Sequence, residues 1–442
     1  MGDRLEERKD FTADVTAKIP EATKLAESGK LAEGLDLLMS VERLCRVGND
    51  YSNLKEVVLT AIRLCRKCED WAQLNASLTL ISKRRGQHSK AVTAMVQEAM
   101  GWLEETPDKE HRVSLLVTLR DMTDGKIFVE AERTKLTRIL AQFKEEEGDV
   151  AGAADVMQEV HVETYGALDK REKADFILEQ IRLTLGKKDY IRALIQSRKI
   201  NRKVLLDEDM QDIKVRFYRL MVEYNIHEKA PFNLCQDFHS IFDTPEVKSS
   251  DDNKNWQEPL EAAVLFLVLS PFSNHQQDML FRVEKYTHLD KLPQYKALVK
   301  LFTTPEIIGY PLQGQEELEA NPSLAAGGPE LLQKWKVDLK LRVVQHNIRV
   351  IAKYYKQIYT KRLAELLGLG EAEAERNVAD MVCDGSLGYA KIDRPAGIVS
   401  FSKPKPPEEI LSEWNSDIAQ LLQLVERSCH LINKENMLHK IV

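Results

Sequence analysis

The chain has 442 residues, 43% hydrophobic and 30% charged, with a formal net charge of −7 at pH 7. This composition is typical of a folded protein of two or three domains and excludes a disordered chain. Six cysteines are too few for a disulfide framework, and no apolar run is long enough to cross a bilayer.

The first residues carry several charges and no apolar core. We therefore expect no signal peptide and no membrane partner, and a location in the cytoplasm and nucleus.

Residues 1–245 contain an internal repeat, in which a polar turn precedes a helix that opens with an apolar residue and then a small one. The equivalent turn residues are Lys30, Asp70, Asp149 and Asp189. Their spacing fits a period of about 40 residues with one degenerate unit near Glu110. One helix pair cannot bury its apolar face, whereas stacked pairs can. The sequence therefore predicts a TPR-like α-solenoid of helix pairs over residues 1–245, a scaffold typical of protein binding.

Two segments, residues 243–259 and 311–329, are rich in Pro, Gly, Ser and Asp, and we expect loops there. Residues 260–332 are predicted to be the helical part of a second module.

Residues 333–402 are predicted to form a winged helix. Its first helix has an apolar stripe with spacings of three and four, made of Val344, Ile348, Ile351, Tyr355 and Ile358. Two shorter helices follow, Thr360–Leu367 and Glu371–Cys383, and the first of them ends before Gly368. Two β-type runs, residues 388–393 and 397–401, then flank a turn at Pro395, which predicts a β-hairpin.

Charge argues against DNA as the ligand of this winged helix. Residues 371–384 hold five acidic side chains and one basic side chain, so they would repel phosphate. Residues 334–362 are instead strongly basic, with nine Lys or Arg and one acid. We read that stretch as a basic helix that either docks on an acidic protein surface or is simply solvated.

The hairpin offers an exposed edge that could pair with a strand of another chain. The predicted interface residues on this wing are Tyr389, Ile392, Ile398, Val399 and Phe401. The alternative is a wing covered by its own chain.

Residues 408–442 are predicted to form one long helix after a proline-rich linker. Its apolar stripe, a second predicted subunit interface, consists of Leu411, Trp414, Ile418, Leu421, Val425 and Ile432. Such a stripe requires partner helices, since packing supplies most of the stability of a helix in water. The helix either folds back on the preceding module or enters a bundle with other chains, and we favour the bundle.

No catalytic constellation is present. Cys65 and Cys68 form a single pair with no second metal-like pair nearby, and Pro231 stands where a zinc-protease motif at His227 would need its second histidine. We expect no catalytic, metal or cofactor-binding residues, and therefore no enzyme.

Four stretches resemble the PCI family of scaffold subunits, and in particular its proteasome-lid members: residues 301–307, 345–355, 361–367 and 390–399. The resemblance implies a mainly α-helical protein in which a helical-repeat arm precedes a winged helix. It implies a non-catalytic scaffold in the lid of the 26S proteasome regulatory particle, acting in ubiquitin-dependent degradation.

The partners that the resemblance implies are other PCI lid subunits, the metallo-deubiquitinase lid subunit, and the ATPase ring and core particle, in a hetero-oligomer without nucleic acid. The alternatives are a scaffold like subunit four of the COP9 signalosome, or an RNA-binding PCI protein that uses the basic stretch.

Overall fold

The computed structural model describes residues 11–106, 108–166, 168–249 and 253–439. The chain divides into two compact units. The first runs to Glu228 and includes residues 240–255, and the second holds residues 229–239 and the chain from Trp256 onward. The domain boundaries expected from the sequence stay predictions.

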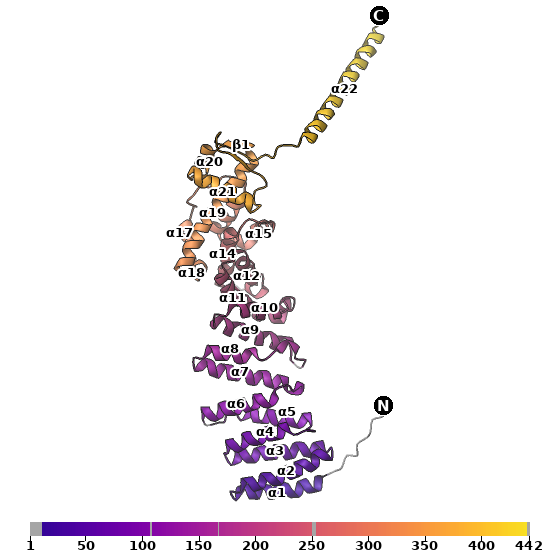
Figure 1. Cartoon of the computed structure of the whole chain (residues 1–442), viewed down its shortest axis with the longest axis vertical. Helices are drawn as coiled ribbons and strands as arrows, with labels where there is room; N and C mark the ends of the chain where they lie inside the picture. Colours follow the sequence, from indigo (N-terminus) through magenta and orange to yellow (C-terminus); the bar gives the residue numbers. More distant parts are fainter. Residues whose placement is uncertain (1–10, 107, 167, 250–252, 440–442) are drawn as a thin grey trace. The chain divides into compact units, whose positions relative to one another are not determined.

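The first unit is built of helices that pack in chain order. They are α1 (Thr12–Glu27), α2 (Leu31–Val47), α3 (Tyr51–Lys67), α4 (Trp71–Lys83), α5 (Ser89–Gly101), α6 (Lys109–Thr123), α7 (Glu130–Glu146), α8 (Val150–Gln158), α9 (Lys170–Gly186), α10 (Tyr190–Lys199), α11 (Gln211–Glu228) and the short α13 (Pro245–Ser249). Contacts join neighbours such as α1 with α2, and next neighbours such as α3 with α5 (Figure 1). The expected stack of paired helices is confirmed.

The turns of the sequence repeat share one backbone conformation. The residue before each N-cap has positive φ, as at Gly148 (85°) and at Glu69 (55°). The next N–H then donates to a carbonyl five residues back, for example from Asp149 to Lys144 at 2.9 Å, which closes the preceding helix. The aspartate side chain in turn caps the next helix: Asp149 Oδ1 accepts from the N–H of Gly152 at 2.8 Å.

Asp70 and Asp189 cap α4 and α10 in the same way, while Lys30 occupies the N-cap position of α2 without a side-chain bond. The polar residue that marks each repeat is therefore a helix cap. Exposed side chains with this local role are visible in a sequence because they depend on few neighbours.

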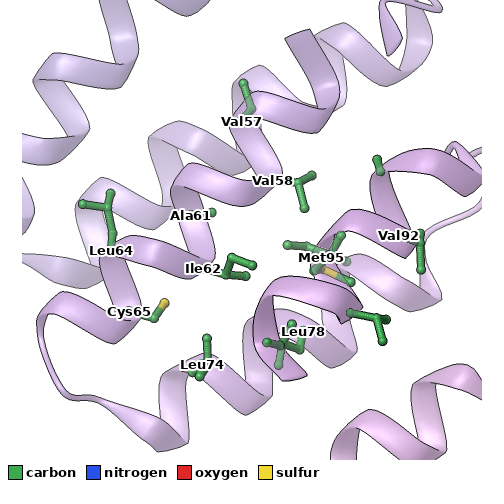
Figure 2. Close-up of a cluster of buried hydrophobic side chains, with 14 of the residues drawn as sticks. Val57, Val58, Ala61, Ile62, Leu64, Cys65, Leu74, Leu78, Val92 and Met95 are labelled. Atoms are coloured by element: carbon green, nitrogen blue, oxygen red, sulfur yellow. The ribbon is translucent and has the colours of Figure 1, made fainter. Parts of the chain in front are cut away.

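A core of small and branched side chains fills the space between helices of the first unit. Figure 2 shows Ile62 of α3, Leu74 and Leu78 of α4, and Met95 of α5 turned toward one another, and all four are fully buried. Gly34 illustrates how closely the helices approach, because a Cβ placed there would lie 3.0 Å from the carbonyl oxygen of Ala22. Small residues at such contacts allow the pairs to stack.

The second unit takes in most of α12 (Pro231–Phe242) and the elements that follow. They are α14 (Asn253–Leu269), α15 (Asn274–Glu284), α16 (Pro293–Thr303), α17 (Gln315–Glu319), α18 (Pro322–Ala325), α19 (Pro329–Tyr354), β1 (Gln357–Tyr359), α20 (Thr360–Leu367), α21 (Glu371–Cys383), β2 (Lys391–Asp393), β3 (Ile398–Ser400) and α22 (Pro407–Leu438). The bounds expected for α20 and α21 are confirmed.

The two expected loops are partly wrong. Helices α13 and α14 occupy much of residues 243–259, of which residues 250–252 lie outside the described residues, and α17 and α18 lie within 311–329. Proline misled the prediction, because it breaks a helix interior but is favoured in the first turn, where Pro322 and Pro329 stand.

The wing is a three-stranded antiparallel sheet of order β1-β3-β2, not the expected two-stranded hairpin. Val399 of the central strand is opposite Ile358 of β1 on one side and Ile392 of β2 on the other. Ile358 was expected on the helical stripe, but α19 ends at Tyr354 and Tyr355 is already extended. Pairing with a strand forty residues away overrides the local period.

Candidate protein interaction surfaces

A shared core holds the winged helix together. The buried stripe of α19, which includes Ile348 and Ile351, packs with apolar residues of α20, α21 and the sheet. The remaining members of this core are Val344, Ile358, Leu363, Ala364, Leu367, Ala374, Val378, Met381, Leu387, Val399 and Phe401. This core fixes the sheet against α20 and α21.

Hydrogen bonds between its elements set the position of the wing. Gly368, at φ 65°, ends α20, and the N–H of Leu369 donates to Ala364 O at 3.0 Å. The N–H of Thr360 donates to Gly397 O at 2.8 Å, which joins the start of α20 to the turn between β2 and β3. Arg394 in that turn donates from Nε to Oε1 of Glu375 on α21 at 2.6 Å. The wing is therefore held at its tip as well as at its base.

The structure separates the five predicted wing residues into two groups. Val399 and Phe401 are buried in the core, so their side chains support the sheet from inside. Tyr389, Ile392 and Ile398 are half-buried and keep part of their side chains on the surface. Because β3 is central, the two sheet edges available to another strand are those of β1 and β2. That these residues contact another subunit stays a prediction.

Helix α22 carries the second predicted surface. No residue from Pro407 to Leu438 is buried, although the helix has an apolar stripe along its length. The exposed fraction of the predicted stripe side chains ranges from 41% at Ile418 to 63% at Trp414. The structure brings Leu411, Trp414, Ile418, Leu421, Val425 and Ile432 onto one continuous helix. A run of exposed apolar residues this long is characteristic of a protein-binding surface.

The charged stretches differ from the expected single basic helix. Residues 334–362 run through α19, β1 and the start of α20, so they do not form one helix. Arg342 donates from Nε to Leu269 O at 3.0 Å, and burial lowers its pKa. Lys336 pairs with Glu319 at 2.7 Å. The expectation that the stretch is a single helix is therefore wrong, and whether it docks on an acidic surface stays a prediction.

Most acidic side chains of α21 lie on its exposed surface. Glu371, Glu373, Asp380 and Asp384 are exposed, while Glu375 pairs with Arg394. In a winged-helix DNA-binding protein, the helix equivalent to α21 enters the DNA groove. Here that helix presents negative charge to solvent, which would repel the phosphates of DNA.

The described residues contain no group of three His, Cys, Asp or Glu side chains placed to hold a metal ion. Burial raises the pKa of Cys65 to about 11, so its thiol is unreactive at neutral pH. Among the described helices, none has the length and apolar content needed to span a membrane.

Sequence reasoning missed strand β1. A signal was present, because Tyr355, Ile358 and Tyr359 lie within five residues and are of the aromatic and branched types that favour strands.

Comparison with known families gives three consecutive matches. Residues 33–250 match the family PSMD12/CSN4, N-terminal, and residues 314–403 match the PCI domain. Residues 408–440, which contain almost all of α22, match the 26S proteasome regulatory subunit RPN5 C-terminal domain. The resemblance to the PCI family is confirmed.

Curated relatives match over nearly the whole chain. The 26S proteasome non-ATPase regulatory subunit 12 of Dictyostelium discoideum is 38% identical, covering 99% of this chain and 97% of the relative. The subunit 12 homolog A of Arabidopsis thaliana is 40% identical, covering 94% and 99%. The 26S proteasome regulatory subunit RPN5 of Saccharomyces cerevisiae is 37% identical, covering 98% and 97%. The chain therefore belongs to the RPN5/PSMD12 family of 26S proteasome non-ATPase regulatory subunits, which carry a PCI domain.

Proposed function

We propose that this chain is a non-catalytic scaffold subunit of the lid of the 26S proteasome regulatory particle, where it holds lid subunits together for ubiquitin-dependent protein degradation. The observation that carries the proposal is the stripe of α22, whose large apolar side chains are all exposed in the isolated chain. The region that matches the RPN5 C-terminal domain is this helix. Its stripe becomes buried when the chain joins a hetero-oligomer.

The wing supplies the second contact in this proposal. The outer edges of β1 and β2 present backbone N–H and C=O groups, and half-buried Ile392 lies on edge strand β2. Other PCI lid subunits are the expected partners of the sheet edge and of α22. The metallo-deubiquitinase subunit, the ATPase ring and the core particle are the expected neighbours of the rest of the chain, in cytoplasm and nucleus.

The decisive experiment places charge on the stripe. Replacing Trp414, Ile418 and Leu421 together by Asp should leave the purified chain folded and abolish its incorporation into the complex, because three carboxylates would have to be buried. The readout is native mass spectrometry of complexes purified from cells that express the tagged variant.

A matched control uses the polar side of the same helix. Replacing Ser416, Gln420 and Gln423 by Asp adds the same charge and should leave incorporation unchanged. Normal incorporation of the stripe variant would refute the proposal.

A COP9 signalosome scaffold is the second candidate, since the match over residues 33–250 is to a family shared by PSMD12 and CSN4. The same purification separates the two, because co-purification with proteasomal ATPases supports the lid and co-purification with a deneddylase supports the signalosome.

A further inference from the structure

A cavity of about 300 Å³ in the second unit has a positively charged lining that the interaction surfaces above do not use. It lies among α15, α16 and α19. Its walls include Phe272, Phe302, His346, Arg349 and Lys353, and no aspartate or glutamate lines it.

Arg349 is the central group. Its guanidinium lies 4.0 Å from the ring centroid of Phe272, a cation–π contact that fixes its position. Its Nη1 is buried and has no hydrogen-bond partner in the described part of the chain. Within the same residues, no carboxylate forms an ion pair with Arg349 or with Lys353.

The histidine of the wall does not compensate this charge. His346 donates from Nε2 to the carbonyl oxygen of Glu306 at 3.2 Å, so that nitrogen is already used. Burial and the adjacent Arg349 lower the pKa of His346, which keeps its ring neutral at pH 7. Burial and Arg342 lower the pKa of Arg349 to about 10, a value at which the guanidinium is still charged at neutral pH.

A buried charged donor without an acceptor is costly, and a carboxylate is the acceptor whose geometry matches a guanidinium. Aromatic walls beside the charge suit an apolar neighbour of that carboxylate. We propose that this cavity binds an acidic side chain, Asp or Glu, flanked by an apolar residue, from a segment of another protein, with Arg349 as its main hydrogen-bond donor and Lys353 at its rim.

Charge and shape favour a peptide over a nucleic acid. The lining combines two cations with several aromatic and aliphatic side chains in a concave site, whereas an RNA backbone needs a row of exposed cations. The proposal relies on the proposed function only in taking a protein as the ligand, and the test below involves no assembly, so the two can fail separately.

The test compares two capped peptides on the full-length chain by saturation-transfer NMR: acetyl-Leu-Glu-Leu-amide and acetyl-Leu-Gln-Leu-amide. The glutamate peptide should bind roughly tenfold or more tightly, because a charge-assisted hydrogen bond to Arg349 is available to it alone. Equal affinity of the two peptides, or no binding at millimolar concentration, would overturn the proposal.

Variants locate the site. Arg349→Gln should remove the discrimination between the peptides, and Arg349→Lys should retain part of it, because charge remains but the planar fork is lost. Lys353→Gln changes an exposed side chain, so its weaker effect is measurable even where Arg349→Gln fails to fold. Lys340→Gln, an exposed lysine of α19 outside the lining, is the matched control and should bind like the unchanged chain.

A labelled single-stranded RNA serves as the competing probe. Glutamate discrimination that survives both Arg349→Lys and Lys353→Gln unchanged would place the site elsewhere. RNA binding that depends on these two residues, without peptide discrimination, would replace the proposal by a nucleic-acid site.

Discussion

Helices α19 and α22 are both long and both carry an apolar stripe at helical spacing, yet they use it in opposite ways. Ten of the 26 residues of α19 are buried, and none of the 32 residues of α22 is. The stripe of α19 is covered by α20, α21 and the sheet of its own chain. Apolar periodicity therefore identifies the face that will be buried but does not say whether the same chain covers it.

The difference is large in energetic terms. Burying a Leu or Ile side chain is worth about 1.5–3 kcal/mol, so the six predicted stripe residues of α22 could together supply on the order of 10 kcal/mol to an association. Part of that gain is lost to the entropy of association. In α19 the corresponding burial already stabilises the folded chain. Helix α19 is therefore a determinant of stability, and α22 is a determinant of assembly.

The largest effect is expected from a charge placed in the core that α19 shares with the sheet. Val399→Arg places a cation at a fully buried position of the central strand, and we expect a loss of more than about 4 kcal/mol of unfolding free energy in the winged helix. Hydrogen exchange of peptides from residues 357–401 measures this loss of unfolding free energy.

The control for this variant is Ile392→Arg on the neighbouring strand, where the side chain is half-buried. Its cost should stay below about 2 kcal/mol, because the guanidinium can reach water. Equal exchange in the two variants would show that Val399 is not part of the core.

A second prediction compares the same truncation on the two helices. Ile348→Ala in α19 should cost about 2–5 kcal/mol, because the side chain is fully buried and leaves a cavity. Ile418→Ala in α22 should change the unfolding free energy of the isolated chain by less than about 0.5 kcal/mol, since this side chain is 41% exposed. Urea unfolding followed by circular dichroism measures both. A comparable loss in the α22 variant would mean that α22 packs on its own chain.

Much of this fold could be predicted from the sequence where the signals are local. The N-cap aspartates Asp70, Asp149 and Asp189 mark helix starts, and Gly368 marks the end of α20, because each depends on a few neighbouring backbone atoms. The bounds of α21 followed from the same kind of signal.

What could not be predicted depends on distant partners. Ile358 fits the stripe of α19 by spacing, and only its pairing with Val399 shows that it belongs to a strand. Val399 and Phe401 were expected on the wing surface, but a third strand and α19 place them inside. The cavity at Arg349 is assembled from three helices, so no single stretch of sequence contains it.

The smallest expected effect is on the pH dependence of stability, and it compares one ion pair that involves α19 with one that involves α22. On α19, Lys336 lies 2.7 Å from Glu319, and hydrogen bonds from Lys336 and Gln315 lower the pKa of Glu319 below its ordinary value of 4.5. This interaction stabilises the folded chain fully above pH 4.5, and the stability is lost as the pH falls through the lower, folded-state pKa. Because both side chains are partly exposed, we expect less than about 1 kcal/mol.

Lys336→Met should therefore flatten the dependence of the urea midpoint on pH in the acidic range. The matched variant is Lys405→Met, which removes the fully exposed partner of Glu413 on α22 and should leave that dependence as it is in the unchanged chain. The Lys336–Glu319 pair joins α19 to α17, so it is lost when the chain unfolds. The Lys405–Glu413 pair joins residues only eight apart in sequence, so unfolding of the core should affect it little. If both variants flatten the profile equally, then α22 is anchored to the unit in the isolated chain, and the division between a folding helix and an assembly helix does not hold.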